Sequence, residues 1–161
     1  MNAISDPSSL AARRAWMAVF ARTPCAELSA ALDAALEGAA PPAFDWLRAP
    51  QTGLAMVRGR IGGTGDAFNV GEATVTRATL RLRGDGANAT IGVACHLGRD
   101  KRRAELAALA DALLQQPQRH RLLHARLVEP LAARAAAARA QQREQVASTR
   151  VEFFTMVRGD A

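Results

Sequence analysis

Apolar residues at helical spacing open the chain. The pattern predicts a first helix over residues 9–22 and a second helix after Thr23, its expected N-cap, with Pro24 at the first helical position. Gly38 predicts a left-handed end to the second helix. Residues 1–8 lack this periodicity and are expected to be disordered. The inward face of the first helix is predicted from Ala12, Trp16, Val19 and Phe20.

Between residues 43 and 97 the spacing changes to short β-like runs that glycines separate. Two linkers, residues 62–66 and residues 84–88, have the length and glycine content of hairpin turns. The alternation of apolar and polar residues changes phase midway through residues 73–82, which indicates a β-bulge there. We therefore predict an antiparallel meander of about four strands, over the ranges 44–48, 53–61, 73–83 and 90–96.

Helical periodicity returns at Asp100 and continues to Pro117. A last helical region is predicted over residues 118–146, where Pro130 should begin a new helix or kink this one. Its second half is rich in alanine, arginine and glutamine, so it adds little to a core. The order of elements predicts a single α+β domain over residues 1–161, with two N-terminal helices, a small antiparallel sheet and two C-terminal helices.

The last segment, residues 148–161, is apolar where chain ends are usually polar. It holds two phenylalanines, a methionine and two valines, so a surface must cover it. That surface is either the core of the chain's own domain or a partner protein. The candidate docking residues are Arg150, Val151, Phe153, Phe154, Met156, Val157 and Arg158.

Arginine dominates the charge of the chain. The formal net charge is +6 at pH 7, and Lys101 is the only lysine. Part of this excess accompanies an alanine excess and reflects composition rather than function. A guanidinium grips an anion through two parallel hydrogen bonds, so nucleic acid, a nucleotide and an acidic protein surface are all candidate partners.

The chain shows no targeting or membrane signal. No apolar run approaches the roughly 18 residues of a membrane span. Residues 1–9 are polar, so we expect a cytoplasmic protein without a membrane partner. Cys25 and Cys95 lack metal-site spacing and are expected to be free thiols that act as small buried hydrophobes.

Groups that carry catalysis are scarce. The chain has no tyrosine, and neither serine nor cysteine stands in a recognisable nucleophile motif. His120 and His124 stand four residues apart without a third ligand, so we predict solvated helix residues rather than a metal site. The carboxylates are scattered along the chain. We predict no catalytic residue, no metal site and no cofactor bound by this chain alone.

Two basic segments are candidates for binding an anion or a partner. One is a glycine-rich turn after Arg60, which either aims backbone N–H groups at a phosphate or is a loop that needs positive φ. The other begins a predicted helix with Asp100 as N-cap, and its basic side chains either meet an anion or are solvated. The candidate residues are Arg60, Gly62, Gly63, Thr64, Gly65, Arg99, Asp100, Lys101 and Arg102.

Several segments together resemble one family. The C-terminal segment reads S-x-R-V-x-F-F-T-M-V-R-G-D. Five further segments occur in the family's order and cover nearly the whole chain: RAWM at 14–17, AEL at 26–28, RIGGTGD at 60–66, EATVTR at 72–77 and GRDK at 98–101. On these segments the chain resembles the PhnG subunit family of the bacterial carbon–phosphorus lyase core complex. It departs from the family's pattern in extra alanine and arginine and in loops around Pro41 and Asn88, which carry no motif.

This resemblance implies a role in the machinery that lets bacteria use phosphonates as a phosphorus source. It implies PhnH, PhnI, PhnJ and ATPase-like PhnK subunits as partners, with two copies of this chain. It also implies that the complex displaces adenine from ATP with an alkylphosphonate to form alpha-D-ribose 1-alkylphosphonate 5-triphosphate. Within the family's complex, nucleosidase chemistry is attributed to PhnI and radical cleavage to PhnJ, so this chain would be a non-catalytic or assisting subunit.

Two other classes of function stay open on the sequence. The arginine excess is compatible with a free-standing basic domain that binds nucleic acid, although the predicted sheet lacks exposed aromatic pairs for base stacking. A self-sufficient enzyme is the third class, and the scarcity of catalytic groups argues against it.

Overall fold

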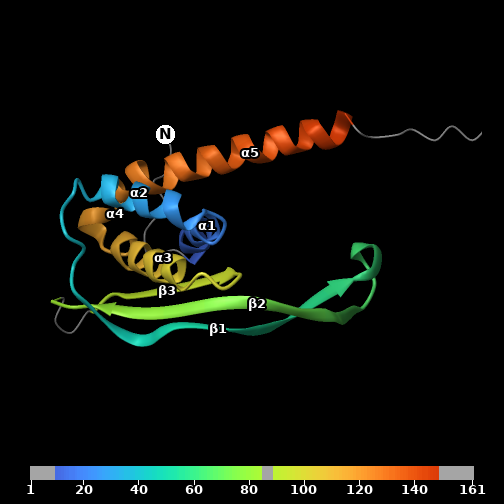
Figure 1. Cartoon of the computed structure of the whole chain (residues 1–161), viewed down its shortest axis with the longest axis horizontal. Coiled ribbons are helices and arrows are strands. Elements are labelled where there is room, and N and C mark those ends of the chain that lie inside the picture. The colour runs from blue at the N-terminus through green and yellow to red at the C-terminus, as the bar shows by residue number, and fades with distance from the viewer. Residues whose placement is uncertain (1–9, 85–88, 149–161) are drawn as a thin grey trace, which may run out of the picture.

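The computed structural model describes residues 10–84 and 89–148. The three strands of its sheet are antiparallel, and the described helices pack against one face of that sheet only (Figure 1). The predicted α+β class is therefore confirmed, whereas the predicted disorder of residues 1–8 lies outside the described residues. The elements are α1 Leu10–Phe20, α2 Cys25–Ala35, β1 Phe44–Arg60, η1 Ile61–Gly63, β2 Ala67–Leu82, β3 Ile91–Leu97, α3 Lys101–Leu114, α4 Pro117–Leu123, η3 His124–Val128 and α5 Glu129–Ser148.

The sheet has fewer strands than the sequence predicts. The runs at 44–48 and 53–61 are parts of one 17-residue strand, β1, so the predicted four or so strands become three. Register shifts on both sides of Arg48 accommodate extra residues in β1. Pro50 is tolerated there because β1 is an edge strand. The strand thus continues through a stretch that looks like a break in the sequence.

The bulge predicted within residues 73–82 is also misplaced. β2 pairs with β3 without interruption from Val75 to Arg81, and the extra residues opposite it belong to β1. A further register shift lies nearer the hairpin turn, between Val57 and Arg58. The order β1–β2–β3 is the predicted antiparallel meander.

The core lies between the sheet and the helices, with α3 at its centre. From Thr76 onward, every second side chain of β2 is buried, and these side chains face α3. Gly92 of β3 marks a close approach, since a Cβ there would lie 1.9 Å from the Ala108 carbonyl oxygen. Helix α3 therefore packs directly on the backbone of β3. The largest buried side chains of the core include Trp16, Phe20, Leu28, Leu80, Leu113, Leu114, Leu127 and Leu131.

The predicted helix cap at Thr23 is wrong, whereas the predicted break at Pro130 and the predicted left-handed end at Gly38 are confirmed. Thr23 does not cap α2, because its hydroxyl donates to the Val19 carbonyl oxygen (2.9 Å) and so closes the end of α1. The helical region predicted over 118–146 is divided into α4, the π-helical turn η3 and α5, and α5 begins one residue before Pro130, where a new helix or a kink was predicted. Pro130 is the second residue of α5 and directly follows the π-helical turn, whose wider spacing coincides with the place where the proline offers no N–H. Gly38 has the predicted left-handed conformation, with φ of 75°.

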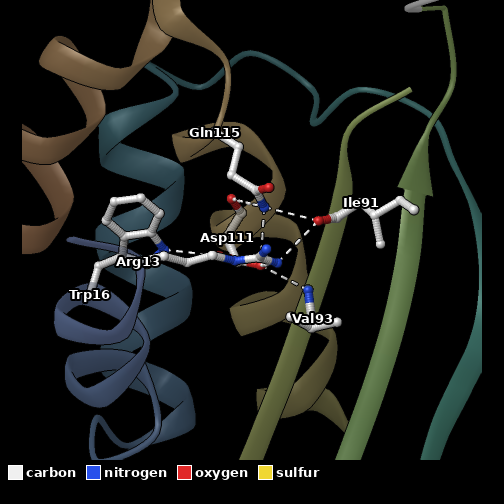
Figure 2. A network of polar contacts seen from close by, with 6 residues as sticks. All are labelled: Arg13, Trp16, Ile91, Val93, Asp111 and Gln115. Atoms are coloured by element: carbon white, nitrogen blue, oxygen red, sulfur yellow. Dashed lines mark hydrogen bonds and ion pairs between the residues drawn. The ribbon is translucent and has the colours of Figure 1, made fainter. Parts of the chain in front are cut away.

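A buried carboxylate joins α1, α3 and β3 (Figure 2). Asp111 of α3 is fully buried and accepts hydrogen bonds from Trp16 Nε1 (2.9 Å) and from the Val93 backbone N–H (2.9 Å). Arg13 donates to both oxygens of Asp111, at 3.1 and 2.7 Å. This carboxylate is therefore paired with a guanidinium and hydrogen-bonded on all sides, which makes its burial tolerable.

The same group of side chains closes the free edge of β3. Arg13 Nη2 and Gln115 Nε2 both donate to the Ile91 carbonyl oxygen, at 3.3 and 2.9 Å. Unpaired backbone groups at a sheet edge invite another strand. Here side chains from α1 and α3 occupy the backbone groups of Ile91 and Val93 instead. We call Arg13, Trp16, Asp111 and Gln115 the edge cluster.

Candidate interaction surface

Part of the β1–β2 hairpin projects beyond the third strand. β3 pairs with β2 only from Val75 to Arg81, so residues 67–74 of β2 pair with β1 alone. Together with residues 54–60 of β1 and the connecting turn, they form a two-stranded extension that passes beyond β3 and α3 (Figure 1). We call residues 54–74 the ribbon.

Large apolar side chains of the ribbon are exposed. Their exposed fractions run from 43% for Val57 to 77% for Ile61. An isolated two-stranded hairpin is only marginally stable in water, and gathered exposed apolar side chains mark interaction surfaces. The exposed set is Leu54, Met56, Val57, Ile61, Phe68 and Val70.

The strand register places these side chains on both faces of the ribbon. Thr76 is buried on the helix side of the sheet, and its hydroxyl meets that of Thr52 at 3.0 Å. Leu54 and Met56 follow Thr52 at every second residue, so they lie on the helix side. Val57 lies on the opposite face. Apolar groups therefore face outward on both sides of this extension.

The predicted glycine-rich turn forms the tip of the ribbon. Gly62 and Gly63 have φ of 61° and 78°, so the turn does need conformations that favour glycine. Arg60 Nη1 donates to the Gly65 carbonyl oxygen (2.8 Å), which holds the side chain against the turn. Thr64 is exposed beside them. A shallow hollow of about 440 Å³ opens here, lined by Arg58, Gly59, Arg60, Gly63 and Ala67.

The second predicted basic segment lies at the base of the ribbon. The Gly98 N–H donates to the Thr74 carbonyl oxygen (2.9 Å), so α3 begins where the ribbon leaves the sheet. Asp100 is the N-cap of α3, as predicted, because its carboxylate accepts the Arg103 backbone N–H (2.9 Å). The ribbon's length separates this segment from the tip, so the structure does not bring the two candidate segments together.

The side chains of the basic segment have different environments. Arg102 forms an ion pair with Glu105 at 2.5 Å, one helical turn away. Arg99 and Lys101 are exposed. The carboxylate of Asp100 already occupies the helix end, where an anion would otherwise bind. Binding of an anion at this segment would therefore depend mainly on the side chains of Arg99 and Lys101.

Buried polar contacts lie beneath the basic segment. Arg103 Nη2 donates to the Leu97 carbonyl oxygen (2.8 Å) and lies 2.5 Å from His96 Nδ1. Burial raises the pKa of the Cys25 thiol, and the negative charge of Asp100 raises that pKa further. A thiol with a raised pKa is a poor nucleophile near neutral pH. These contacts hold the start of α3 in place and do not form an acid–base pair.

Both cysteines are free thiols, as predicted, but they differ in exposure. Cys25 is half-buried, whereas Cys95 is exposed, so the prediction of buried thiols is wrong for Cys95. Cys95 faces away from α3 because the alternate residues of β3, Ala94 and His96, are the buried ones. Cys95 therefore lies on the uncovered face of the sheet, and the rate at which its thiol reacts indicates whether that face is accessible.

That uncovered face carries a row of arginines. Arg77 and Arg81 are exposed residues of β2 with Thr79 between them. Arg48 of β1 pairs with Thr79, so it lies on the same face. The face is basic as well as partly apolar, since Ile91 and Leu97 of β3 are also exposed on it. Arginine and apolar groups together are typical of protein-binding surfaces.

The prediction of solvated helical histidines is wrong for His120. His120 is buried, not solvated: its Nδ1 donates to the Leu114 carbonyl oxygen (2.8 Å) and its ring packs against Trp16. His124 Nδ1 lies 3.2 Å from a carboxylate oxygen of Glu129. Among residues 10–84 and 89–148, no three His, Cys, Asp or Glu side chains are grouped to hold a metal ion.

Helix α5 extends outward, and most of its residues are exposed (Figure 1). Neither it nor another helix in the described ranges has the length and apolar character needed to cross a membrane. The predicted docking residues of the C-terminal segment, from Arg150 to Arg158, lie outside the described residues. Their prediction therefore stays a prediction.

Comparison with known proteins identifies the family. Residues 11–159 match the family described as phosphonate metabolism protein PhnG. The chain belongs to the PhnG family. It is similar to the PhnG subunit of alpha-D-ribose 1-methylphosphonate 5-triphosphate synthase from Rhizobium meliloti (strain 1021), with 48% identity over 156 residues that cover 97% of this chain and 95% of the relative. The resemblance found in the sequence is thereby confirmed.

The PhnG-like segments have distinct places in the structure. Trp16, in the first of them, belongs to the edge cluster and the core. The segment at 98–101 contains the N-cap of α3, and the segment at 60–66 forms the tip of the ribbon. Among the described family-like segments, those at 60–66 and 98–101 are both largely exposed, so each is a candidate contact surface of this PhnG-family chain.

Sequence reasoning placed Trp16 on the inward face of the first helix but missed the other members of the edge cluster. Asp111 was not singled out, although it is a lone carboxylate within the apolar run of α3. Such a residue on the inward face of a helix is a signal for a buried partner. Its partner Arg13 is 98 residues away in the sequence, so only the tertiary structure reveals the pair.

Proposed function

We propose that this chain is a non-catalytic, assisting subunit of a phosphonate-processing complex. In that complex an alkylphosphonate displaces adenine from ATP, which yields alpha-D-ribose 1-alkylphosphonate 5-triphosphate. The partners are PhnH, PhnI, PhnJ and PhnK-like subunits in the cytoplasm, with two copies of this chain. The chain binds no cofactor alone, and ATP is a substrate of the whole complex. The name of the relative, a subunit of alpha-D-ribose 1-methylphosphonate 5-triphosphate synthase, supports this assignment.

The observation that carries the proposal is the ribbon. Two strands leave the sheet with exposed apolar side chains on both faces, and no described helix covers them. Each fully buried large apolar side chain would gain about 1.5–3 kcal/mol on leaving water. The six exposed apolar side chains of the ribbon therefore provide a strong driving force for association with a partner protein.

Co-expression with PhnH-, PhnI- and PhnJ-like subunits tests this role of the ribbon. We expect the double variant Val57→Ser/Phe68→Ser to keep the unfolding temperature of the isolated chain but to lose co-purification. Leu122→Ser, at an exposed position of α4 away from the ribbon, is the matched control and should assemble. Full assembly and activity of the double variant would contradict the proposal.

The two cysteines give a second readout of the same experiment. Exposed Cys95 should react with a maleimide faster than Cys25, whose pKa is raised by burial. If a partner covers the uncovered face of the sheet, assembly should slow the labelling of Cys95 and leave that of Cys25 unchanged. Equal labelling of Cys95 before and after assembly would place the partner on the ribbon alone.

Catalysis is tested separately, on purified proteins. The isolated chain, mixed with ATP and methylphosphonate, should release no adenine, whereas the assembled complex should. Adenine release by the chain alone would overturn its assignment as a non-catalytic subunit.

Removal of residues 148–161 tests the apolar C-terminal segment. We expect the truncated chain to fold and to lose co-purification with the PhnI-like subunit. Retained assembly with full activity would show that the segment is not required for docking.

A nucleic-acid-binding domain is the second candidate, and the arginines of the uncovered sheet face favour it. Arg48, Arg77 and Arg81 lie together there. Binding of this kind weakens steeply with salt. A salt titration with a labelled oligonucleotide distinguishes the two functions, since absence of binding at moderate salt removes this candidate.

A further inference from the structure

Two arginines flank the hollow at the tip of the ribbon. Arg58 pairs with Asn69 across the strands and Arg60 with Ala67, and the two arginines stand two residues apart on β1. They therefore share one face, with their Cα atoms about 7 Å apart. Gly59 and Gly63 also line the hollow and add no side chain to it.

Each guanidinium is held by one backbone contact. Arg60 Nη1 donates to Gly65 O (2.8 Å), and Arg58 Nη2 donates to Ala67 O (3.3 Å). A guanidinium has five N–H donors, so each arginine keeps donors for a ligand. The backbone contacts reduce the side-chain freedom that ligand binding would otherwise remove.

The positive charge at the tip is not balanced by a described carboxylate. Asp66 and Glu72 are the acidic residues of the ribbon, and neither lies within ion-pair distance of Arg58 or Arg60. By contrast, arginines of the body such as Arg13, Arg83 and Arg102 have carboxylate partners. Two like charges on one face repel each other, and an anion between them removes that repulsion.

We propose that the guanidinium groups of Arg58 and Arg60, near the end of the ribbon, bind a phosphate group of a polyphosphate. In the assembled complex, that polyphosphate is the substrate held by a partner subunit. This rests on the proposed function, in which the complex acts on ATP and forms a 5-triphosphate. Arginine suits the task because its planar fork matches phosphate oxygens and keeps its charge at any ordinary pH. The glycines allow the ligand to approach the backbone closely.

The first experiment uses the isolated full-length chain and sodium tripolyphosphate. The arginine Nε–H resonances of Arg58 and Arg60 are followed by nuclear magnetic resonance. We expect saturable shifts, with orthophosphate binding more weakly, and a loss of affinity of about tenfold for each arginine changed to glutamine. Arg22→Gln, at an exposed arginine that bonds only within its own helix end, should bind as the unchanged chain does. Tip resonances that do not move, or a double variant that binds equally well, would overturn the proposal.

The second experiment uses the assembled complex with Arg58→Gln/Arg60→Gln. We expect normal assembly, a KM for ATP raised about tenfold or more, and partial recovery with lysine at both positions, since lysine keeps the charge but not the fork. Loss of assembly would overturn the proposal, because the arginines would then hold a partner's carboxylates. An unchanged KM would overturn it as well. Failure of the unchanged chain to assemble would instead sink the proposed function and leave the tripolyphosphate result standing.

Discussion

One pair of strands, β1 and β2, has two different environments along its length. Where α3 covers β2, the side chains of Ala78, Leu80 and Leu82 are buried at every second residue. In the ribbon, Phe68 and Val70 of the same strand are exposed. Both parts carry apolar side chains suited to a pleated surface. The difference lies in what covers them, and not in their strand-forming tendency.

This contrast separates two uses of apolar residues. Those of the covered half stabilise the chain's own fold, because burial occurs within the molecule. Those of the ribbon add little to the stability of the isolated chain, and their burial requires another molecule. Substitutions in the covered half should therefore change stability, whereas substitutions in the ribbon should change association.

The largest expected effect comes from the edge cluster. Asp111→Ala removes a fully buried carboxylate and leaves Arg13, Trp16 and the Val93 N–H without their acceptor. We expect a loss of about 3–5 kcal/mol in the free energy of unfolding, measured by urea denaturation. Glu72→Ala, at an exposed carboxylate of the ribbon, should stay within about 0.5 kcal/mol. Equal losses of stability at both positions would contradict the proposed difference between the covered half and the ribbon.

Two glycines give the next test. In Gly92→Ala the new Cβ would meet the Ala108 carbonyl oxygen at 1.9 Å, so α3 must move off the sheet. Overpacking of this kind costs about 1–3 kcal/mol or more. In Gly71→Ala the Cβ meets nothing within 4 Å, so thermal unfolding should stay nearly unchanged. A stable Gly92→Ala variant would show that α3 and β3 are not in direct backbone contact.

The smallest effect concerns an exposed ion pair on the covered half. A hydrogen bond from Arg83 Nε (2.8 Å) and the charge of that guanidinium lower the pKa of Asp45 from 3.8. Because the folded-state pKa is lowered, the stabilisation is present above pH 3.8 and is lost as the pH falls through the folded-state value. The free energy of unfolding of Asp45→Asn should therefore differ slightly from that of the unchanged chain near neutral pH, and the two should be equal in strong acid. A large difference in high salt would contradict the surface character of this pair.

Features with a local physical cause could be predicted from the sequence. Gly38 and Asp100 were placed correctly because a helix end depends on the few residues around it. The glycine-rich turn after Arg60 was also located, since positive φ strongly favours glycine. The antiparallel meander followed from turn spacing alone.

Features that depend on distant residues could not be predicted. The continuity of β1 through Arg48 depends on bulges that form against β2. The burial of His120 depends on Trp16, and that of Asp111 on Arg13, both far away in the sequence. Single-sequence periodicity contains no information about such pairs. The predicted helix cap at Thr23 failed because its hydroxyl bonds backward to α1.

Only part of the candidate surface could be predicted from the sequence. Arg60 and its glycines were singled out, but the neighbouring Arg58 was not, because its position beside the hollow depends on strand register. The strand after the turn was also predicted to begin at residue 73, whereas β2 begins at Ala67, so the predicted hairpin was too short to reveal the ribbon. The error therefore lies in the length of the predicted strand, and not in the types of residue that were singled out.

The direct contact between α3 and Gly92 has a mechanical consequence. With no side chain between helix and strand, and β3 hydrogen-bonded to β2, the helix and the sheet should turn as one rigid piece. The ribbon then acts as a lever about 20 Å long, from Leu54 to Arg60. A rotation of the helical layer by about 10° would sweep the tip through about 3–4 Å, enough to make or break a contact at its end.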